Sequence, residues 1–188
     1  IETGGVTINR YCSSGLNSIA MAATQIQSGF YDCIIAGGVE SISTSQGHTN
    51  MHMYVNDKLA EEAPGIYHAM GTTAEAVADR YEVSREAQDE FAFNSQQKWK
   101  KAHDEGVWND EIIPISIPNR KGDPTIVDTD EHPRPEVTLE KLSTLKPVFS
   151  SGDDATVTAG NSSGVNDGAA AMVLVEAELA RKLGLNIM

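Results

Sequence analysis

The residue best suited to covalent chemistry is Cys12, which stands between an apolar alternation and a helical pattern. Val6 and Ile8 alternate with polar residues and predict a short strand, while residues 13–28 place apolar side chains at helical spacing. Cys12 is therefore expected at a helix N-terminus, where unpaired N–H groups and the helix dipole favour the thiolate, the better nucleophile. The pattern predicts an activated cysteine at a tight turn.

The second cysteine, Cys33, has the setting expected of a packing role. It stands in the apolar run D-C-I-I-A-G-G at residues 32–38, which predicts a buried strand of a parallel sheet with Cys33 in the core. A lone cysteine before a helix is also consistent with packing, so Cys12 by itself leaves both roles open. Two distant cysteines predict neither a disulfide framework nor a C-x-x-C metal site, and they favour a reducing, cytoplasmic compartment.

The charge balance narrows the set of partners. The 188 residues carry 14 Lys and Arg against 27 Asp and Glu, a formal net charge of −13, which repels nucleic acid. No apolar run is long enough to cross a bilayer, so no membrane partner is expected. The histidines lack ligand spacing, so no metal is expected. The sequence starts without Met or a signal peptide, which predicts that it begins inside a longer protein.

The elements that must position Cys12 indicate an α/β fold with a helical insertion. Strand, helix and strand follow one another over residues 4–38, and residues 39–69 are polar and loop-like. After the insertion we expect a polar loop at 155–168, a buried strand at 169–175, and a helix at 176–183 that ends at Gly184. We therefore predict three parts: a strand–nucleophile helix–strand unit (1–38), an insertion (39–150) and the start of a second α/β half (151–188).

The insertion carries its own start and stop signals. T-T-A-E at residues 72–75 predicts a capping box for a helix that ends at residue 82. Ser84 is expected to cap a second helix that Gly106 ends. The remaining expectations are an edge strand at 112–117 interrupted by Pro114, an exposed excursion at 118–136, and a short helix at 138–144.

Taken together, several segments resemble the thiolase family in order and spacing, across nearly the whole chain. They are N-R-Y-C-S-S-G-L (9–16), A-G-G-V-E-S (36–41), M-G-T-T-A-E (70–75), S-R-E-A-Q-D (84–89), T-V-T-A-G-N-S-S-G (156–164) and N-D-G-A (166–169). The resemblance implies a layered α/β/α fold with a helical loop domain, here truncated at both ends. It also implies acyl transfer between coenzyme A thioesters, with Cys12 as the residue that takes up the acyl group.

The resemblance also implies machinery that this sequence lacks. Family members use a Gly-His-Pro histidine to activate the cysteine, a Cys-x-Gly cysteine to move the α-carbon proton, and an Asn-Glu-Ala-Phe motif for an oxyanion site. None of the three motifs occurs in the 188 residues. We therefore expect the chain to be inactive by itself and the enzyme to be a larger protein.

Five positions match the coenzyme A contacts of the family. Ser163 and Ala159 match the loop along the pantetheine arm, Arg134 matches a basic residue near the nucleotide, and Met70 and Phe149 match apolar walls. A guanidinium suits phosphate or an adenine face. A solvated loop arginine, a simple loop serine and ordinary core roles for Met70 and Phe149 remain the alternatives. Coenzyme A or acetyl-CoA is the expected substrate, with no bound cofactor.

The subtype prediction rests on one departure from the family pattern and on the R-P-E pattern at residues 134–136. Some biosynthetic members place His directly before the Met-Gly pair, whereas here Ala69 precedes Met70 and His68 is one residue early. This favours the degradative 3-ketoacyl-CoA thiolase of fatty-acid metabolism over acetyl-CoA acetyltransferase. Two further alternatives are a decarboxylating ketoacyl synthase, which lacks such an insertion, and a non-catalytic binding or assembly fragment. By analogy with the family, a homodimer or homotetramer is expected.

Overall fold

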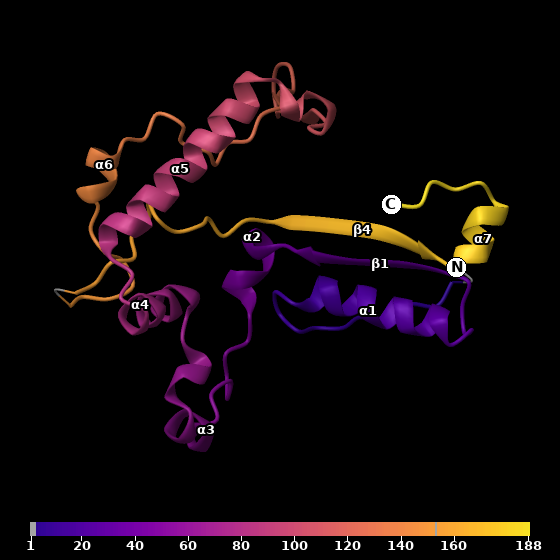
Figure 1. Cartoon of the computed structure of the whole chain (residues 1–188), viewed down its shortest axis with the longest axis horizontal. Coiled ribbons are helices and arrows are strands. Elements are labelled where there is room, and N and C mark those ends of the chain that lie inside the picture. The colour runs from indigo at the N-terminus through magenta and orange to yellow at the C-terminus, as the bar shows by residue number, and fades with distance from the viewer. Residues whose placement is uncertain (1–2, 153) are drawn as a thin grey trace. The chain divides into compact units, whose positions relative to one another are not determined.

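The protein forms two compact units in the computed structural model, which describes residues 3–152 and 154–188. The first unit combines Ile1–Met51 with Val165–Met188, and the second is His52–Gly164. Figure 1 shows the elements along the chain. The unit boundaries lie near 51 and 165, so the structural division differs from the three parts expected from the sequence, and those three parts stay a prediction.

The first unit is built on one helix and one pair of strands. In chain order its elements are α1 (Ser14–Gln27), β1 (Cys33–Glu40), α2 (Ile42–Ser45), the 3-10 turn η1 (Gln46–His48), β4 (Gly168–Val175) and α7 (Ala177–Lys182). The helix predicted at 13–28 and the strands predicted at 32–38 and 169–175 are therefore present. The strand predicted around Val6 and Ile8 is not: residues 3–9 form no strand.

The pairing of β1 with β4 corrects the expectation of a parallel sheet. The two strands are antiparallel, with Cys33 opposite Val175 and Glu40 opposite Gly168. After β1 the chain passes through α2 and η1 into the second unit, and it returns to the first unit before β4. The segment that connects the two paired strands therefore contains the whole second unit. A connection of this length permits either strand direction, so local sequence alone does not decide between parallel and antiparallel pairing.

The two strands are less buried than the sequence predicts, because only one face of the pair is covered. α1 lies along this face (Figure 1), and Ala36 on it is 4% exposed. The alternate residues point the other way, and Ile35 is 74% exposed. Cys33 is on this second face and is exposed, so its predicted place in the core is wrong.

Small residues bring α1 close to β1. A Cβ atom at Gly38 would lie 3.5 Å from the Cα of Gly15, and the Ser18 hydroxyl donates to the Gly37 carbonyl at 2.9 Å. Ala22 on α1 is 4% exposed. Larger side chains would push the helix away, so this packing fixes the helix end that follows Cys12.

The second unit is mostly helical. Its elements are α3 (Asp57–Glu62), the 3-10 turn η2 (Pro64–Tyr67), α4 (Met70–Arg80), α5 (Arg85–Asp104), the 3-10 turn η3 (Val107–Asp110), β2 (Ile115–Ile117), β3 (Thr125–Val127) and α6 (Leu139–Ser143). Ser84 caps α5 as expected, because its side chain accepts from the Ala87 N–H. Thr138 also caps α6, by accepting from the Lys141 N–H. Gly106, at φ 71°, follows the end of α5.

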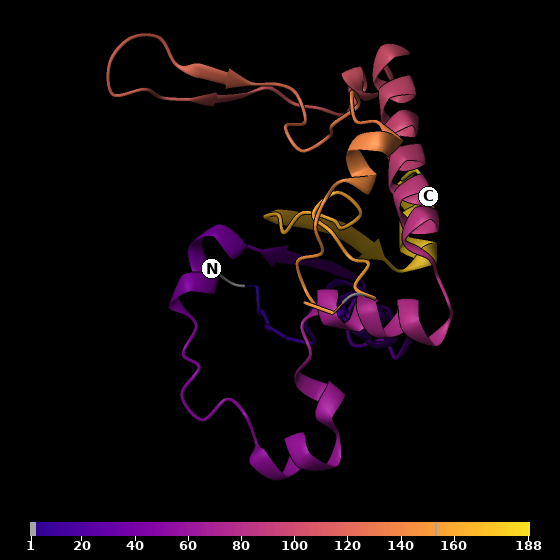
Figure 2. The same ribbon diagram turned by 90° about the vertical axis from the view of Figure 1, so that its left-hand side faces the viewer.

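Three expectations for this region need correction. The loop predicted at 39–69 contains α2 and α3. The strand begins after Pro114, at Ile115, and pairs with β3 inside the predicted excursion; Figure 2 shows this hairpin extending from the rest of the unit. The capping box is wrong, because Ala69 is the N-cap of α4 without a side-chain hydrogen bond and the Glu75 carboxylate binds elsewhere.

The core of the second unit lies between α4, α5, α6 and the polar loop at 155–164. Ala78, Leu142 and Val157 are buried, and Thr158 is fully buried. A Cβ atom at Gly160 would lie 2.5 Å from a Leu145 methyl and 2.6 Å from a Leu142 methyl. The loop therefore packs closely enough to need glycine at this point.

Candidate active site

The turn that carries Cys12 is held by its own side chains. The Tyr11 N–H donates to Asn9 Oδ1 at 2.8 Å, and the Arg10 N–H donates to the Ser14 hydroxyl at 2.8 Å. The Ser14 hydroxyl in turn donates to the Tyr11 carbonyl at 2.7 Å. These bonds connect both sides of Cys12, so the turn has one preferred shape.

Tyr11 adopts a left-handed backbone conformation, with φ 51°. A side chain other than glycine pays a free-energy cost of roughly 1 kcal/mol or more in this region, so surrounding contacts must hold it there. The bonds from Asn9 and Ser14 do so. The result is a sharp bend directly before Cys12, and such strained bends recur at functional sites.

Cys12 lies just before α1, whose first residue is Ser14 and whose N-cap is Ser13. The first two amide groups are already used by the turn, because the Ser13 N–H donates to the Arg10 carbonyl at 3.1 Å and the Ser14 N–H to the Tyr11 carbonyl at 3.0 Å. Cys12 is exposed and free. Its thiol is therefore accessible to a substrate at the end of the helix predicted from the sequence.

The five residues matched to coenzyme A contacts all lie in the second unit, whereas Cys12 lies in the first. Met70 begins α4 and is 72% exposed, and Phe149 is 43% exposed. The Phe149 ring lies directly over Gly71, where a Cβ atom would be 2.1 Å from the ring. Phe149 therefore packs against the first turn of α4, at the residue that follows Met70.

Arg134 is held within its own loop. Its Nη1 donates to the carbonyls of Glu131, His132 and Pro133 at 2.6–2.8 Å, and its backbone N–H donates to Gln96 Oε1 at 2.8 Å. The residue is exposed. The guanidinium therefore organises the loop and remains at the surface.

Ala159 and Ser163 are exposed on the loop that enters β4, after the buried Val157 and Thr158. Sequence reasoning missed the residue that anchors the entrance to this loop. The Glu75 carboxylate accepts from the N–H groups of Thr156 and Val157 at 3.0 Å and from the Thr156 hydroxyl at 2.9 Å. Burial raises the pKa of Glu75, but these hydrogen bonds outweigh it and hold the pKa below its ordinary value.

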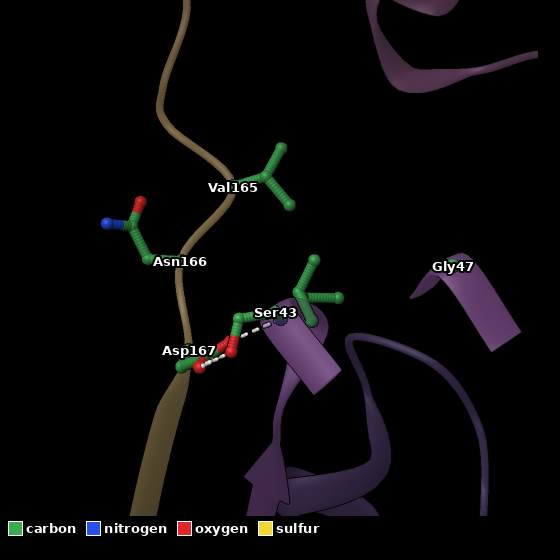
Figure 3. A pocket seen from close by; sticks show the side chains of 6 residues that line it. Ser43, Gly47, Val165, Asn166 and Asp167 are labelled. Carbon is green, nitrogen blue, oxygen red and sulfur yellow. Dashed lines mark hydrogen bonds between the residues drawn. The ribbon is translucent and has the colours of Figure 1, made fainter. Parts of the chain in front are cut away.

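A second anchor, also missed, closes the first unit. The Ser43 N–H donates to Asp167 Oδ1 at 2.9 Å, and the Ser43 hydroxyl donates to the other carboxylate oxygen, as Figure 3 shows. These bonds lower the pKa of Asp167. Ser43 and Asp167 line an open depression of about 700 Å³ together with Ile42, Gly47, Val165 and Asn166. No residue matched to catalysis or coenzyme A lines it.

Two kinds of site are not found in the described part of the chain. Residues 3–152 and 154–188 contain no group of His, Cys, Asp and Glu side chains that could hold a metal ion. In the same residues, no helix is both long and apolar enough to span a membrane.

Comparison with known proteins identifies the family. The family model for the thiolase N-terminal domain matches residues 1–178, and the chain therefore belongs to the thiolase family. It is 49% identical over 192 residues to the 3-ketoacyl-CoA thiolase of Bacillus subtilis, covering 96% of this chain and 47% of that protein. The chain thus spans about half the length of the curated relatives it matches.

Solved structures agree with this assignment. The dimeric peroxisomal thiolase of Saccharomyces cerevisiae matches with a TM-score of 0.82 and 42% identity, over 96% of this chain and 45% of that one. Human mitochondrial 3-ketoacyl-CoA thiolase in complex with CoA matches with a TM-score of 0.72 and 35% identity, over 95% of this chain and 46% of that one. The α/β thiolase fold expected from the sequence is confirmed.

Proposed function

We propose that this chain provides the nucleophile and the coenzyme A contacts of an acyltransferase that forms or cleaves 3-ketoacyl-CoA. The observation that carries the proposal is the exposed Cys12 thiol, held after the strained Tyr11 and before α1, within a chain of the thiolase family. Accessibility and a fixed backbone are what a nucleophile for a bulky thioester needs.

In the cleavage direction, the Cys12 thiolate attacks the 3-keto carbon of the substrate. The bond between carbons 2 and 3 breaks, acetyl-CoA leaves as its enolate and takes up a proton, and the shortened acyl group stays on sulfur. The thiolate of a second coenzyme A then attacks this thioester and releases Cys12. Splitting the reaction into two transfers lowers the barrier of each.

The proton transfers are assigned to residues outside these 188. The sequence contains neither the Gly-His-Pro nor the Cys-x-Gly motif that supplies them in the family. The activity is therefore proposed for the complete protein, with Cys12 as the acylated residue.

For coenzyme A we propose that Ser163 and Ala159 contact the pantetheine arm, Arg134 the nucleotide end, and Met70 and Phe149 the apolar parts. Support comes from their positions in the family pattern and from their exposure, which leaves each side chain accessible to a ligand. Ala159 and Ser163 lie on one anchored loop, and Met70 and Phe149 lie beside Gly71.

The test of the nucleophile compares the two exposed cysteines. The complete protein is incubated with an acyl-CoA and the acylated peptide is identified by mass spectrometry; we expect acylation of Cys12 and not of Cys33. Cys12→Ala should abolish thiolysis, while Cys33→Ala should retain it. Equal labelling of both thiols, or full thiolysis by Cys12→Ala, would refute the assignment.

We further propose the degradative subtype. Ala69, not histidine, precedes Met70 and forms the N-cap of α4, while His68 ends the preceding 3-10 turn. Thiolysis rates for acetoacetyl-CoA and for longer 3-ketoacyl-CoA substrates test this proposal. Comparable or faster cleavage of the longer substrates supports it, and activity confined to acetoacetyl-CoA would instead favour an acetyl-CoA acetyltransferase.

The proposal also covers the oligomeric state, the location and the domain organisation of the complete protein. We propose a homodimer or homotetramer for the complete protein, a cytoplasmic location, and an insertion that separates two α/β halves. Support for assembly comes from the dimeric yeast relative. Sedimentation equilibrium of the complete protein would give its oligomeric state directly.

A further inference from the structure

A buried carboxylate connects α5 to the loop at 156–164. Asp89 is 3% exposed and is the buried charged residue among those described. Its Oδ2 accepts from Arg85 Nε at 2.8 Å, and its Oδ1 accepts from Asn161 Nδ2 at 3.0 Å. A buried carboxylate is tolerated only when such partners compensate for lost water, so Asp89 depends on both neighbours.

Arg85 extends the connection to α6. Its Nη2 donates to the carbonyls of Leu142 and Leu145 at 2.6 and 3.0 Å. The guanidinium thus satisfies carbonyls at the end of a short helix while its Nε holds Asp89. The position of Asp89 is therefore fixed by two helices at once.

Asn161 connects Asp89 to the backbone of the loop by hydrogen bonds. Its Nδ2 donates to Asp89 and to the Thr156 carbonyl at 3.0 Å, and its Oδ1 accepts from the Thr158 N–H at 2.8 Å. Because a carboxylate only accepts, the amide nitrogen must face Asp89, which fixes the orientation of the whole amide. The side chain of Asn161 thereby sets the backbone from Thr156 to Thr158.

The fully buried Thr158 completes the turn. Its hydroxyl oxygen accepts from the N–H groups of Gly160 and Asn161 at 3.1 and 3.3 Å. The exposed Ala159 lies at the tip of this turn, and the exposed Ser163 follows it. The shape of the surface that these two residues present is therefore determined by buried polar bonds.

We propose that Asp89 is a positioning residue for coenzyme A: acting through Asn161, it holds the loop that carries Ala159 and Ser163 in the shape that receives the pantetheine arm. This inference rests on the proposed function. Asp89 touches no substrate in this role, so its replacement should weaken the binding of coenzyme A more than it slows chemistry at Cys12.

The test uses the complete protein and the variant Asp89→Asn. The new amide group places an N–H where Arg85 or Asn161 already donates, leaving one buried donor without an acceptor. We expect KM for coenzyme A in thiolysis to rise about tenfold, the effect of one unmet buried hydrogen bond, with kcat within about twofold of the parent. A loss of folded protein alone would lower kcat and leave KM unchanged.

A second experiment exchanges the two side chains, so that Asn stands at position 89 and Asp at position 161. Asn161→Asp alone sets two carboxylates against each other and should raise KM in the same way. In the double variant Asp89→Asn with Asn161→Asp, the amide at 89 can donate to the carboxylate at 161 and still accept from Arg85. The carboxylate at 161 cannot donate to the Thr156 carbonyl as Asn161 does, so we expect KM to fall back part of the way. Asp104→Asn is the matched control, because Asp104 is an exposed carboxylate on the same helix, paired with Lys100 at 3.4 Å.

The outcomes separate the inference from the function. Unchanged KM in Asp89→Asn, or no recovery in the exchanged double variant, overturns the positioning role while thiolysis by the parent protein stands. A parent protein that neither acylates Cys12 nor binds coenzyme A overturns both. If Asp89→Asn does not fold, Asn161→Ser is measured in its place, with the same rise in KM expected and the same unchanged KM counting against the proposal.

Discussion

At the scale of single residues, two carboxylates accept hydrogen bonds from backbone N–H groups far along the chain. Glu75 and Asp167 each accept from a main-chain N–H and from a neighbouring hydroxyl. Asp89 accepts from two side chains instead. In each case a charged acceptor forms a stronger bond than a neutral one would, so the charge itself contributes to the local structure.

The first prediction concerns Glu75. Glu75→Gln removes the charge and one of the two accepting oxygens, and we expect the free energy of unfolding at neutral pH to fall by about 1–2 kcal/mol. Because hydrogen bonds hold the folded-state pKa of Glu75 below its ordinary value, its contribution is present above the ordinary pKa and is lost as pH falls through the folded-state pKa.

Urea denaturation of the complete protein at neutral and acidic pH measures this effect. The difference between parent and variant should shrink as the solution becomes more acidic. Glu90→Gln is the control, because Glu90 is exposed on α5 and should show little difference at either pH. A gap between parent and Glu75→Gln that stays constant with pH would contradict the proposed cause.

At the scale of elements, helix ends and close packing position the site. Ser84 caps α5 at the turn that carries Arg85 and Asp89. On α4, Gly71 allows the Phe149 ring to lie against the helix. These two positions carry the second and third predictions.

Ser84→Ala removes the side-chain cap of α5, which accepts from the Ala87 N–H at 3.2 Å. Loss of an N-cap typically costs about 1 kcal/mol of stability, and we expect a loss of this size by chemical denaturation. Ser95→Ala, at an exposed position within the same helix, should be neutral or slightly stabilising because alanine favours helices. Equal effects at the two positions would argue against the cap.

Gly71→Ala places a methyl group where the Phe149 ring now lies, 2.1 Å from the nearest ring atom. Overpacking of this kind costs roughly 1–3 kcal/mol, and the ring must move away from α4. We expect a lower melting temperature and weaker coenzyme A binding. Adding Phe149→Ala should relieve the strain, so a double variant no more stable than Gly71→Ala would show that the clash is not the cause.

At the scale of the whole molecule, the chain leaves β1 at Glu40 and comes back through β4 at Gly168. The contact between Ser43 and Asp167 joins the chain just after it leaves and just before it returns. It therefore acts as a clamp at the base of the connection between β1 and β4, which contains the whole second unit. Closing so long a connection is entropically costly, so contacts at its base matter for stability.

The fourth prediction tests this clamp. Asp167→Asn should lower the melting temperature of the complete protein at neutral pH, and Ser43→Ala should do the same. Since hydrogen bonds from Ser43 lower the pKa of Asp167, the stabilisation is present above the ordinary aspartate pKa and is lost as pH falls through the folded-state pKa. The two substitutions should be non-additive, and strict additivity would show that the residues do not act as a pair.

Local sequence determined several of the helices and the turn that carries Cys12. The apolar spacing of α1, the cap at Ser84 and the stop at Gly106 each depend on side chains within a few residues, and the turn around Cys12 is built from Asn9 to Ser14. Interactions over such short distances along the chain follow from residue order. The same motifs were sufficient to predict the thiolase family.

Only the tertiary structure decided which strands pair, which faces are covered and what the carboxylates bind. The strands β1 and β4 pair antiparallel, and Cys33 is exposed because it lies on the face of β1 that no other described element covers. Glu75 binds residues 81 and 82 positions further along the chain, and Ser43 binds a residue 124 positions away. No local periodicity specifies such partners, because they are chosen by the packing of whole elements and by the hydrogen bonds that buried polar groups must find.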